Sequence, residues 1–285
     1  MLDRMSDARG RSNVHEQRVT MSRAIFAALP ALLIAATALP ARAETWFSGD
    51  WYLKVGAAGF VAPNFEGDDD YRFRAQPLVS FGRQGSTTPF SSRNDNISIG
   101  LLDQGYFRAG PTGKLVFGRD SDDSGDLAGL DPVRFGGELG VFAEFYPVDW
   151  LRLRGEIRHG IRSHDGFVGD LAADAFMDVT PTIRVSAGPR ASFGSEDYFD
   201  AWYGVSADEA IASGLSPYDP DGGVESIGFG GAITWKATDT IETSLFGEYS
   251  RLKGPAADSS LVRERGSKNQ FLLGVAATYR FDFSM

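Results

Sequence analysis

The sequence predicts an all-β protein, an antiparallel up-and-down β-barrel that crosses a membrane. Apolar and polar side chains alternate along most of the chain after residue 50, the pattern of strands with two different faces. Several alternating segments exceed the ~5 to 6 residues usual in soluble sheets and match the ~9 to 11 residues of a tilted membrane-spanning strand. The connections between them alternate between short and long, as in bacterial outer-membrane barrels.

The first 43 residues have the features of a segment that is removed during export. A basic start at Met21 is followed by an apolar stretch at 24–40 that is short and interrupted by proline, and then by an Ala-Arg-Ala cleavage pattern ending at Ala43. We therefore expect residues 1–43 to be an N-terminal extension plus signal peptide, and residues 44–285 to form the barrel domain. The start of translation is left open between three methionines: Met1, Met5 and Met21.

Composition narrows the classes of function. The chain has no cysteine, so a disulfide framework, a thiolate metal site and a thiol nucleophile are all excluded. Cleavage after Ala43 would remove six of the 28 basic and three of the 38 acidic residues, leaving a formal net charge of −13. An acidic exported chain lacks the basic footprint that nucleic-acid binding requires.

The clearest strand is the segment that begins at Leu151. Arg152, Arg154 and Arg158 fall on one face of a strand, whereas a helix would scatter them around its axis. Eleven segments share this alternation. They lie at 51–60, 72–82, 96–102, 105–118, 134–146, 151–161, 167–178, 181–193, 224–236, 240–251 and 270–281.

A bacterial barrel with both termini in the periplasm needs an even number of strands. The stretch "TTPFSS" at 87–92, followed by the turn "RNDN", can supply a further short strand. We therefore expect twelve strands, with ten as the alternative if the weak N-terminal segments merge.

The connections divide into two sets. The short ones, "YPVDW", "DVTP" and "KATDT", are expected in the periplasm, and the long ones at 119–133, 194–223 and 252–269 are expected outside the cell. One long connection contains a helix signal. Ser206 can cap the N-terminus with Glu209 three residues later, and Gly214 can end the helix.

The charged residues of the strands identify the face that looks into the barrel. An arginine facing lipid costs about 2 to 4 kcal/mol at the bilayer midplane, so the charged faces must line a polar lumen. Cross-strand ion pairs that fill a narrow interior are one interpretation, and a selectivity lining for small solutes is the other. The lumen-facing set is Lys54, Arg74, Lys114, Glu138, Glu144, Arg152, Arg154, Glu156, Arg158, Arg184, Arg190, Glu242, Glu248 and Arg280.

Aromatic residues near strand ends are expected to form the two interfacial girdles of such a barrel. They are Trp51, Tyr71, Phe81, Tyr106, Phe107, Phe117, Trp150, Trp235, Tyr249, Tyr279 and Phe281. The last strand has a lipid-facing set from Phe271 to Phe281, and it must pair with the first strand so that no backbone edge remains in the membrane. We expect this strand to stop at Phe281 and residues 282–285 to project into the periplasm.

Two groups of residues could carry chemistry. His159, Ser163, His164 and Asp165 resemble the Ser-His-acid set of barrel hydrolases, although neighbouring His and Asp in a turn are common. No phosphate loop or zinc spacing occurs, and we expect no catalytic, cofactor-binding or metal-binding residues.

The second group is an acidic loop with the spacing of a calcium loop, although its last position is Asp rather than Glu. Its residues are Asp120, Asp122, Ser124, Gly125, Asp126 and Asp131. Asp68, Asp69 and Asp70 suggest a second cation-binding loop. Solvated acidic loops explain both stretches equally well, so calcium binding by residues 120–131 is left open.

Several loop stretches resemble the MipA/OmpV family of outer-membrane proteins, the MltA-interacting protein group. The specific motifs are "YGVSADEAIASGL" and "AADSSLV" followed by "GSKNQ", and the resemblance covers about residues 50–281. It implies an outer-membrane barrel without established catalytic residues. For the best-known member it implies a scaffold that links a lytic transglycosylase to a bifunctional penicillin-binding protein in murein synthesis.

These observations lead to three hypotheses. The first is a non-enzymatic outer-membrane scaffold, the second is a narrow channel for small solutes, and the third is a barrel hydrolase. The expected partners are outer-membrane lipids and lipopolysaccharide, the barrel assembly machinery that reads the terminal strand, and the two murein enzymes implied by the resemblance.

Overall fold

The structure is a computed structural model that describes residues 49–83, 90–92 and 95–284. All of these residues belong to one compact unit, Gly49–Met285. The predicted extension and signal peptide at 1–43 lie outside the described residues, so that assignment stays a prediction.

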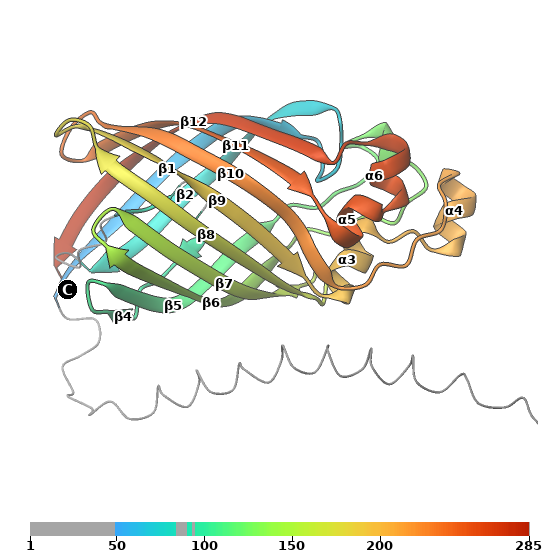
Figure 1. Ribbon diagram of the computed structural model, residues 1–285, viewed down its shortest axis with the longest axis horizontal. Coiled ribbons are helices and arrows are strands. Elements are labelled where there is room, and N and C mark those ends of the chain that lie inside the picture. The colour runs from blue at the N-terminus through green and yellow to red at the C-terminus, as the bar shows by residue number, and fades with distance from the viewer. Residues whose placement is uncertain (1–48, 84–89, 93–94, 285) are drawn as a thin grey trace, which may run out of the picture. The chain divides into compact units, whose positions relative to one another are not determined.

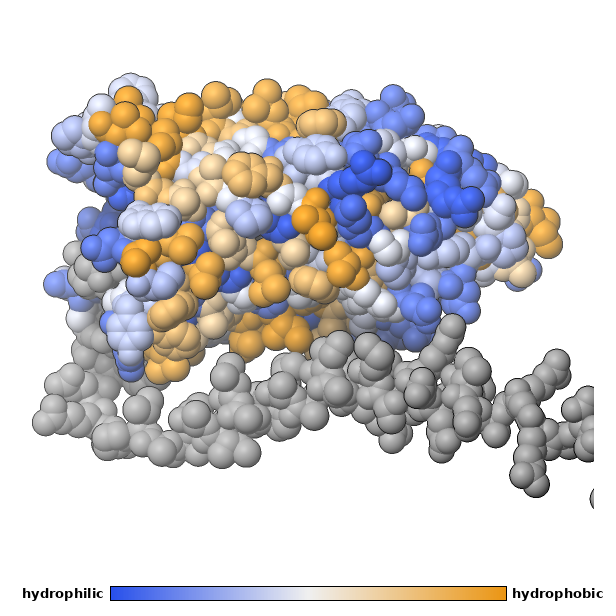
Figure 2. Space-filling model, in the orientation of Figure 1, coloured by the Kyte–Doolittle hydropathy of each residue, from blue (hydrophilic) through white to orange (hydrophobic). Residues whose placement is uncertain are grey.

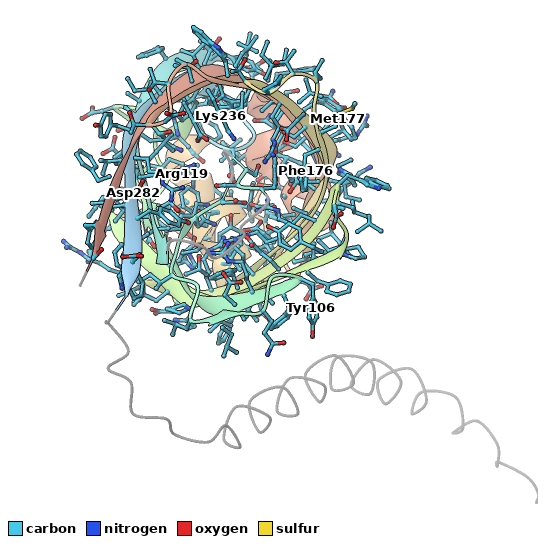
Figure 3. The ribbon with its side chains drawn as sticks, turned by 90° about the vertical axis from the view of Figure 1, so that its left-hand side faces the viewer. Tyr106, Arg119, Phe176, Met177, Lys236 and Asp282 are labelled. Atoms are coloured by element: carbon cyan, nitrogen blue, oxygen red, sulfur yellow. The ribbon has the colours of Figure 1, made fainter. Side chains whose placement is uncertain are left out.

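In the part of the chain that the structure describes, twelve strands form one antiparallel sheet that curls into a nearly closed barrel (Figures 1 and 3). The predicted fold class and the count of twelve are confirmed. The strands are β1 (Asp50–Pro63), β2 (Tyr71–Arg83), β3 (Ile97–Ser98), β4 (Leu102–Asp103), β5 (Phe107–Val116), β6 (Gly136–Val148), β7 (Leu151–Ile161), β8 (Phe167–Asp178), β9 (Ile183–Gly194), β10 (Gly223–Lys236), β11 (Ile241–Leu252) and β12 (Asn269–Ser284).

The two faces of the wall follow the predicted alternation. Large apolar side chains such as Leu139, Leu171 and Leu273 are more than half exposed on the outer wall, and Figure 2 shows apolar residues along the strands, with hydrophilic ones gathered at the end where α5 and α6 lie. In Figure 3, Phe176 points into the barrel and its neighbour Met177 points out. Their exposed fractions are 6% and 60%. The exposed wall is therefore the lipid-facing surface.

The first and last strands pair over most of their length, from Asp50 opposite Ser284 to Val61 opposite Leu273. The prediction that the last strand stops at Phe281 is therefore wrong. The strand continues because the start of β1 offers backbone partners as far as Ser284, whose hydroxyl donates a hydrogen bond to Asp50 Oδ1 at 2.5 Å.

One seam interrupts the pairing. The sheet order runs from β2 through β1 and β12 down to β5 and β3, and within the described residues β2 and the other end of the sheet share one isolated parallel bridge, Phe81 to Ile99. β3 and β4 are short and both pair with β5. The barrel is therefore nearly, but not fully, closed.

The twelfth strand is not the one predicted at "TTPFSS". Residues 87–89 of that stretch lie outside the described residues, and residues 90–92 form no strand. The predicted strand 96–102 is instead broken into β3 and the start of β4. The reason is that Phe90, before β3, lies inside the barrel, where its ring stacks on that of Phe176 with centroids 4.7 Å apart.

The long connections fold into a cap over one end of the barrel. The cap contains α3 (Glu196–Tyr203), α4 (Ala207–Ser213), α5 (Gly254–Asp258), α6 (Ser260–Arg265) and the short helix η2 (Gly125–Leu127). Two apolar clusters hold it together, one around Phe199 and one around Leu261. We refer to this end as extracellular and to the short-turn end as periplasmic, following bacterial outer-membrane barrels.

The helix predicted after Ser206 is present as α4. Ser206 and Glu209 form a capping box, and Gly214 ends the helix in the left-handed conformation with φ 79°. The other cap helices were not predicted, because they are too short to show a helical period. No helix among the described residues has the length and apolar character needed to cross a membrane.

Candidate functional site in the barrel lumen

One half of the lumen, formed by β6 to β9, is filled by ion pairs. Arg152 is fully buried and bonds three carboxylates: Asp95 at 2.7 Å, Asp174 at 2.6 Å and Glu144 at 3.1 Å. Its guanidinium also lies 4.8 Å from the centre of the Phe90 ring. A charged side chain without contact to water is stable only when it is paired and hydrogen-bonded in this way.

A second buried arginine extends the network toward the extracellular end. Arg158 donates to Glu138 at 2.7 Å, Glu156 at 2.6 Å and Asp170 at 2.6 Å. The pairing of β6 with β7 sets Glu144 directly opposite Arg154, and these two also form an ion pair. The predicted cross-strand ion pairs are therefore present in this half.

The other half of the lumen encloses a cavity of about 760 Å³. On β1, β11 and β12 its lining is mostly polar and consists of Tyr52, Lys54, Glu242, Thr278 and Arg280. The apolar cluster built on Ala58, Phe246 and Ala276 reaches the cavity through Leu78, which packs against it. A cavity of this size falls in the range of small-molecule sites, about 300 to 1,000 Å³.

The charges around the cavity are sparsely paired. Lys54 bonds Glu242 at 2.8 Å with both side chains about a quarter exposed. Arg74 donates to the backbone oxygen of Asn64. Neither Arg74 nor Lys114 has a carboxylate within ion-pair distance in the part of the chain that the structure describes. The cavity therefore offers two cations to a bound anion.

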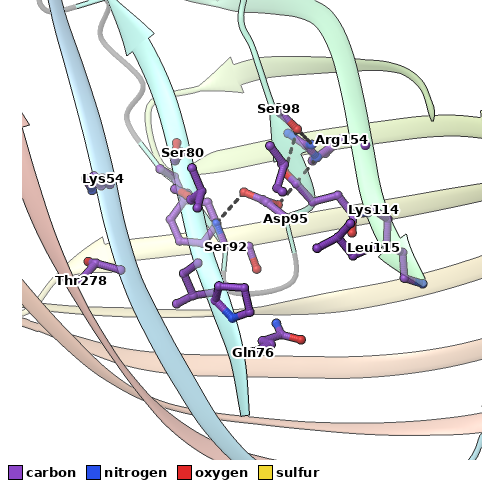
Figure 4. Close-up of a pocket in the computed structure, with 18 of the residues that line it drawn as sticks. Lys54, Gln76, Ser80, Ser92, Asp95, Ser98, Lys114, Leu115, Arg154 and Thr278 are labelled. Carbon is purple, nitrogen blue, oxygen red and sulfur yellow. Dashed lines mark hydrogen bonds and ion pairs between the residues drawn. The ribbon is translucent and has the colours of Figure 1, made fainter. Parts of the chain in front are cut away.

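The cavity reaches the seam. β2 contributes Gln76 and Ser80 from its inner face and Val79 from its outer face, and β5 contributes Leu115 and Lys114 (Figure 4). Because both faces of β2 line the space, it extends between the strands toward the lipid. Unpaired backbone is tolerated at membrane depth where it lines such a cavity.

Two contacts bound the seam. The Phe81–Ile99 bridge closes its periplasmic end, and at the extracellular end Arg72 on β2 bonds Asp123, which follows β5, at 2.6 Å. Sequence reasoning missed the seam. A signal was present in Pro77, since proline within a sheet is confined to edge strands and bulges.

The candidate hydrolase residues are not assembled. His164 is buried, and its Nε2 lies 3.3 Å from Glu138 Oε1 while its Nδ1 accepts from the backbone of Gly166 at 3.2 Å. The Ser163 hydroxyl is buried without a hydrogen-bond partner among the described residues, and Asp165 is exposed. A nucleophile needs a hydrogen bond to its base, so this arrangement does not favour catalysis.

The remaining histidine is separate from this group. His159 packs edge-on against Phe167 on the outer wall, with ring centroids 4.6 Å apart. It belongs to the lipid-facing surface rather than to the lumen, because β7 alternates and Arg158 beside it points inward.

The acidic loop does not take the form of a calcium loop. Asp120 Oδ1 accepts the backbone N–H of Asp122 at 2.9 Å, Asp123 is bonded to Arg72, and the Asp131 N–H donates to Glu209 Oε1 at 2.8 Å. These contacts make a compact turn in place of a ligand shell. Among the described residues, the acidic groups that converge are Asp126, Asp68 and Asp69.

The roof of the cavity is a hydrogen-bonded cluster below the cap. Tyr198 and Tyr203 on α3 both donate to Glu225 Oε1, at 2.6 and 3.0 Å. Burial, and then the neighbouring carboxyl groups of Glu225 and Glu66, raise the pKa of both tyrosines well above the usual value. Burial also lowers the pKa of Arg119, which lies 5.3 Å from the Trp202 ring centre.

A family model described as MltA-interacting protein MipA matches residues 55–281. The chain belongs to this family. No curated protein sequence matches it. The model spans nearly all of the barrel, so this member of the MipA family is an outer-membrane β-barrel protein.

Solved structures similar to this MipA-family chain are distant barrels. Neisserial surface protein A is 10% identical, with 82% of this chain and 99% of that chain covered and a TM-score of 0.26. OprG from Pseudomonas aeruginosa is 12% identical, with 82% and 96% covered and a TM-score of 0.29. Ail of Yersinia pestis is 10% identical, with 82% and 99% covered and a TM-score of 0.24. The barrel assignment rests on the strand pairing and the family.

The loop motifs that resemble the MipA family form the core of the cap. In "YGVSADEAIASGL", Val205 and Leu215 are buried in one apolar cluster, and Val205 pairs with Tyr218. In "AADSSLV", Ala256 and Val262 are buried in the other cluster. These motifs therefore specify how the cap of the MipA-family barrel folds.

Proposed function

We propose that this chain is a non-catalytic outer-membrane anchor that holds a lytic transglycosylase, together with a penicillin-binding protein, at the periplasmic face of the outer membrane. The support is the family, whose description names an interaction with MltA, and the extent of the match. Because the family model covers the barrel itself, the contact surface is expected on the barrel rather than on an added domain.

The observation that carries this proposal is a pair of matching turns on the periplasmic rim. In the β8–β9 turn, Thr180 Oγ1 accepts the backbone N–H of Ile183 at 2.9 Å. In the β10–β11 turn, Thr238 Oγ1 accepts the N–H of Ile241 at 3.0 Å. Both turns share the sequence Thr-x-Thr-Ile.

Each turn is also fixed to the next strand. The Lys236 N–H donates to Thr182 O, and the Arg280 N–H donates to Thr240 O, both at 2.8 Å. A surface that is already ordered loses little conformational entropy when a partner binds. Two rigid, similar turns side by side therefore suit a protein contact better than they suit chemistry.

The test is co-purification from crosslinked cells with variants at the turn tips. Pro181→Arg and Asp239→Arg change exposed residues and keep both structural threonines. We expect the wild-type chain to recover a lytic transglycosylase and the double variant to lose it. Asp208→Arg on α4, at the extracellular end, is the matched control and should recover the enzyme normally.

The proposal fails if wild-type protein recovers neither murein enzyme under conditions that recover known envelope complexes. It also fails if the turn variant recovers them as well as wild type does. Heat-modifiable migration on a gel verifies that each variant still forms the barrel. The assembly machinery and lipopolysaccharide stay predicted partners.

The lumen cavity favours a second candidate function, the binding or passage of small solutes. Arg74 and Lys114 give the cavity cations without carboxylate partners among the described side chains, so we expect anions to be preferred. Single-channel recording in planar bilayers tests this. Steady steps with anion selectivity would support passage, and a silent protein would exclude it without affecting the anchor proposal.

A further inference from the structure

Three carboxylates from two different extracellular connections meet beside the seam. Asp68 and Asp69 belong to the connection between β1 and β2, and Asp126 belongs to η2 in the connection after β5. Each offers an oxygen atom, and these atoms lie within 4.8 Å of one another. Three like charges at this separation repel unless a cation or protons neutralise them.

Asp68 makes the cluster more than a group of surface acids. Its side chain is 0% exposed, and its Oδ1 accepts only the backbone N–H of Asp70, at 3.0 Å. Its Oδ2 is buried and has no hydrogen-bond partner among the described residues. A buried carboxylate oxygen without a partner strongly destabilises the fold, because it has lost its hydrogen bonds to water and has no protein donor in their place.

No side-chain cation within the described ranges forms an ion pair with Asp68, Asp69 or Asp126. Two arginines that contact neighbouring residues bond other groups. Arg265 donates to the backbone oxygens of Asp126 and Ser213, and Arg72 bonds Asp123. Burial, followed by the charge of Asp68, raises the pKa of Asp126, as expected for a carboxyl group in an under-neutralised cluster.

The backbone holds Asp68 in place independently of the carboxylates. Gly67, with φ +107°, donates its N–H to Gln270 Oε1 at 3.2 Å, and Gln270 Nε2 donates back to Asp68 O at 3.3 Å. The Asp68 N–H bonds Phe65 O at 3.0 Å. These hydrogen bonds therefore hold Asp68 near the other carboxylates although the charges repel.

Asp126 is fixed from the other side. Its N–H donates to the Ser124 hydroxyl at 3.3 Å, and the next residue, Leu127, is 2% exposed in the apolar core of the cap. The two connections thus present their carboxylates to a shared point before any ligand arrives, which favours binding.

We propose that Asp68, Asp69 and Asp126 bind one calcium ion that joins the two connections across the extracellular end of the seam. The donors are all carboxylate oxygens without histidine or cysteine, the set that suits hard cations. Calcium accepts irregular shells of 6 to 8 oxygens, so water completes the coordination, whereas magnesium demands near-ideal octahedral geometry. Asp69 is exposed, which gives the ion a route in and out.

This site differs from the calcium loop that the spacing of residues 120–131 left open. The two share Asp126, but the new site replaces Asp120 and Asp122 with residues more than 50 positions away in the chain. That difference supplies matched controls. Asp68→Asn and Asp126→Asn remove proposed ligands, whereas Asp120→Asn and Asp122→Asn make the same chemical change in the same acidic region.

The experiment titrates calcium chloride into the full barrel, freed of lipopolysaccharide and folded in nanodiscs, and follows binding by calorimetry. We expect one calcium per chain with the weak affinity typical of extracellular sites, about 0.1 to 1 mM. Asp68→Asn and Asp126→Asn should weaken binding by about tenfold or more, and the two control variants should bind like wild type.

Thermal unfolding gives a second measurement, because Asp68→Asn is expected to stabilise the protein without calcium and to lose the stabilisation that calcium gives. In chelator, Asp68→Asn should unfold at a higher temperature than wild type, because it removes an uncompensated buried charge. In calcium, wild type should gain stability by mass action and the variant should not. No wild-type binding up to about 10 mM, or binding lost in the control variants and kept in Asp126→Asn, would overturn the proposal.

Discussion

The two halves of the lumen are filled by different kinds of side chain. The half built from β6 to β9 buries Arg152 and Arg158 among carboxylates, whereas the half built from β1, β11 and β12 carries an apolar cluster around Phe246 and the partly exposed Lys54–Glu242 pair. Both show the same alternation of faces in the sequence. What differs is that Phe90 and Asp95 lie in the lumen, where they contact Phe176 and Arg152 of the first half and leave the cavity beside the second.

The largest expected effect on stability comes from replacing Arg152, the central arginine of the half built from β6 to β9. Arg152→Met keeps much of the side-chain volume but leaves Asp95, Glu144 and Asp174 with fewer cations. Breaking a buried pair by removing one partner costs about 3 to 5 kcal/mol of unfolding free energy. Urea-driven unfolding in nanodiscs measures the loss.

The matched control is Arg184→Met, which breaks an arginine–carboxylate pair with Asp178 near the periplasmic rim. There the side chains are 25% and 55% exposed, so we expect about 1 kcal/mol or less. If the two variants lose equal stability, burial does not distinguish the network from an ordinary surface pair, and the contrast between the two halves is wrong.

The next effect concerns the roof of the cavity. Tyr198→Phe removes a 2.6 Å hydrogen bond to the buried Glu225 and should cost about 1 to 3 kcal/mol. Because the folded-state pKa of Tyr198 lies above its unfolded value, the protein holds this proton more tightly when folded. Stability is then full below about pH 10 and falls as the pH rises above it.

Absorbance of tyrosinate near the end of an alkaline titration measures this directly. Wild type should show a fraction of tyrosines that ionise only when the cap opens, and Tyr198→Phe/Tyr203→Phe should lose that fraction. Tyr106, which is 58% exposed, supplies the control, since Tyr106→Phe should leave the fraction that depends on opening of the cap unchanged.

Periodicity in the sequence was enough to predict the wall of the barrel, its faces and the capped helix after Ser206, because each depends on neighbours a few residues apart. The seam, the cap helices and the inward stretch could not be predicted that way. The pairing of Arg152 with Asp95 spans 57 positions. The meeting of Asp68 with Asp126 likewise depends on two loops that become neighbours only after the sheet has curled.

The last strand illustrates the same limit on a small scale. An aromatic residue at Phe281 is a reasonable end when β12 is considered alone. Its actual end at Ser284 is set by β1, whose first residues pair with Asp282 and Phe283, and by the ring of Phe81, which lies 6.2 Å from that of Phe283. Strand ends in a barrel depend on the partner strand as much as on the strand itself.

A smaller effect is expected from the Lys54–Glu242 ion pair, in the half of the lumen that encloses the cavity. Lys54→Met removes the lysine ammonium group from Glu242 beside the cavity, but both side chains are 23% exposed, so water can replace the lost contact. We expect about 1 kcal/mol or less in the same unfolding experiment. A loss as large as that of Arg152→Met would mean that the cavity is dry, and the comparison would fail.

The smallest effect on stability tests whether a charged residue lines the cavity or belongs to the buried ion-pair network. Lys114 points into the cavity and has no ion-pair partner among the residues that the structure describes, so Lys114→Ala removes charge without stranding a carboxylate. We expect unfolding within about 0.5 kcal/mol of wild type. Any anion selectivity in bilayer recordings should fall, because the cavity then keeps fewer free cations.

Arg134→Ala, an exposed change outside the cavity, should leave both measurements unchanged. If Lys114→Ala instead destabilises the barrel as strongly as Arg152→Met does, Lys114 belongs to the filling network, and the cavity is a structural space rather than a site.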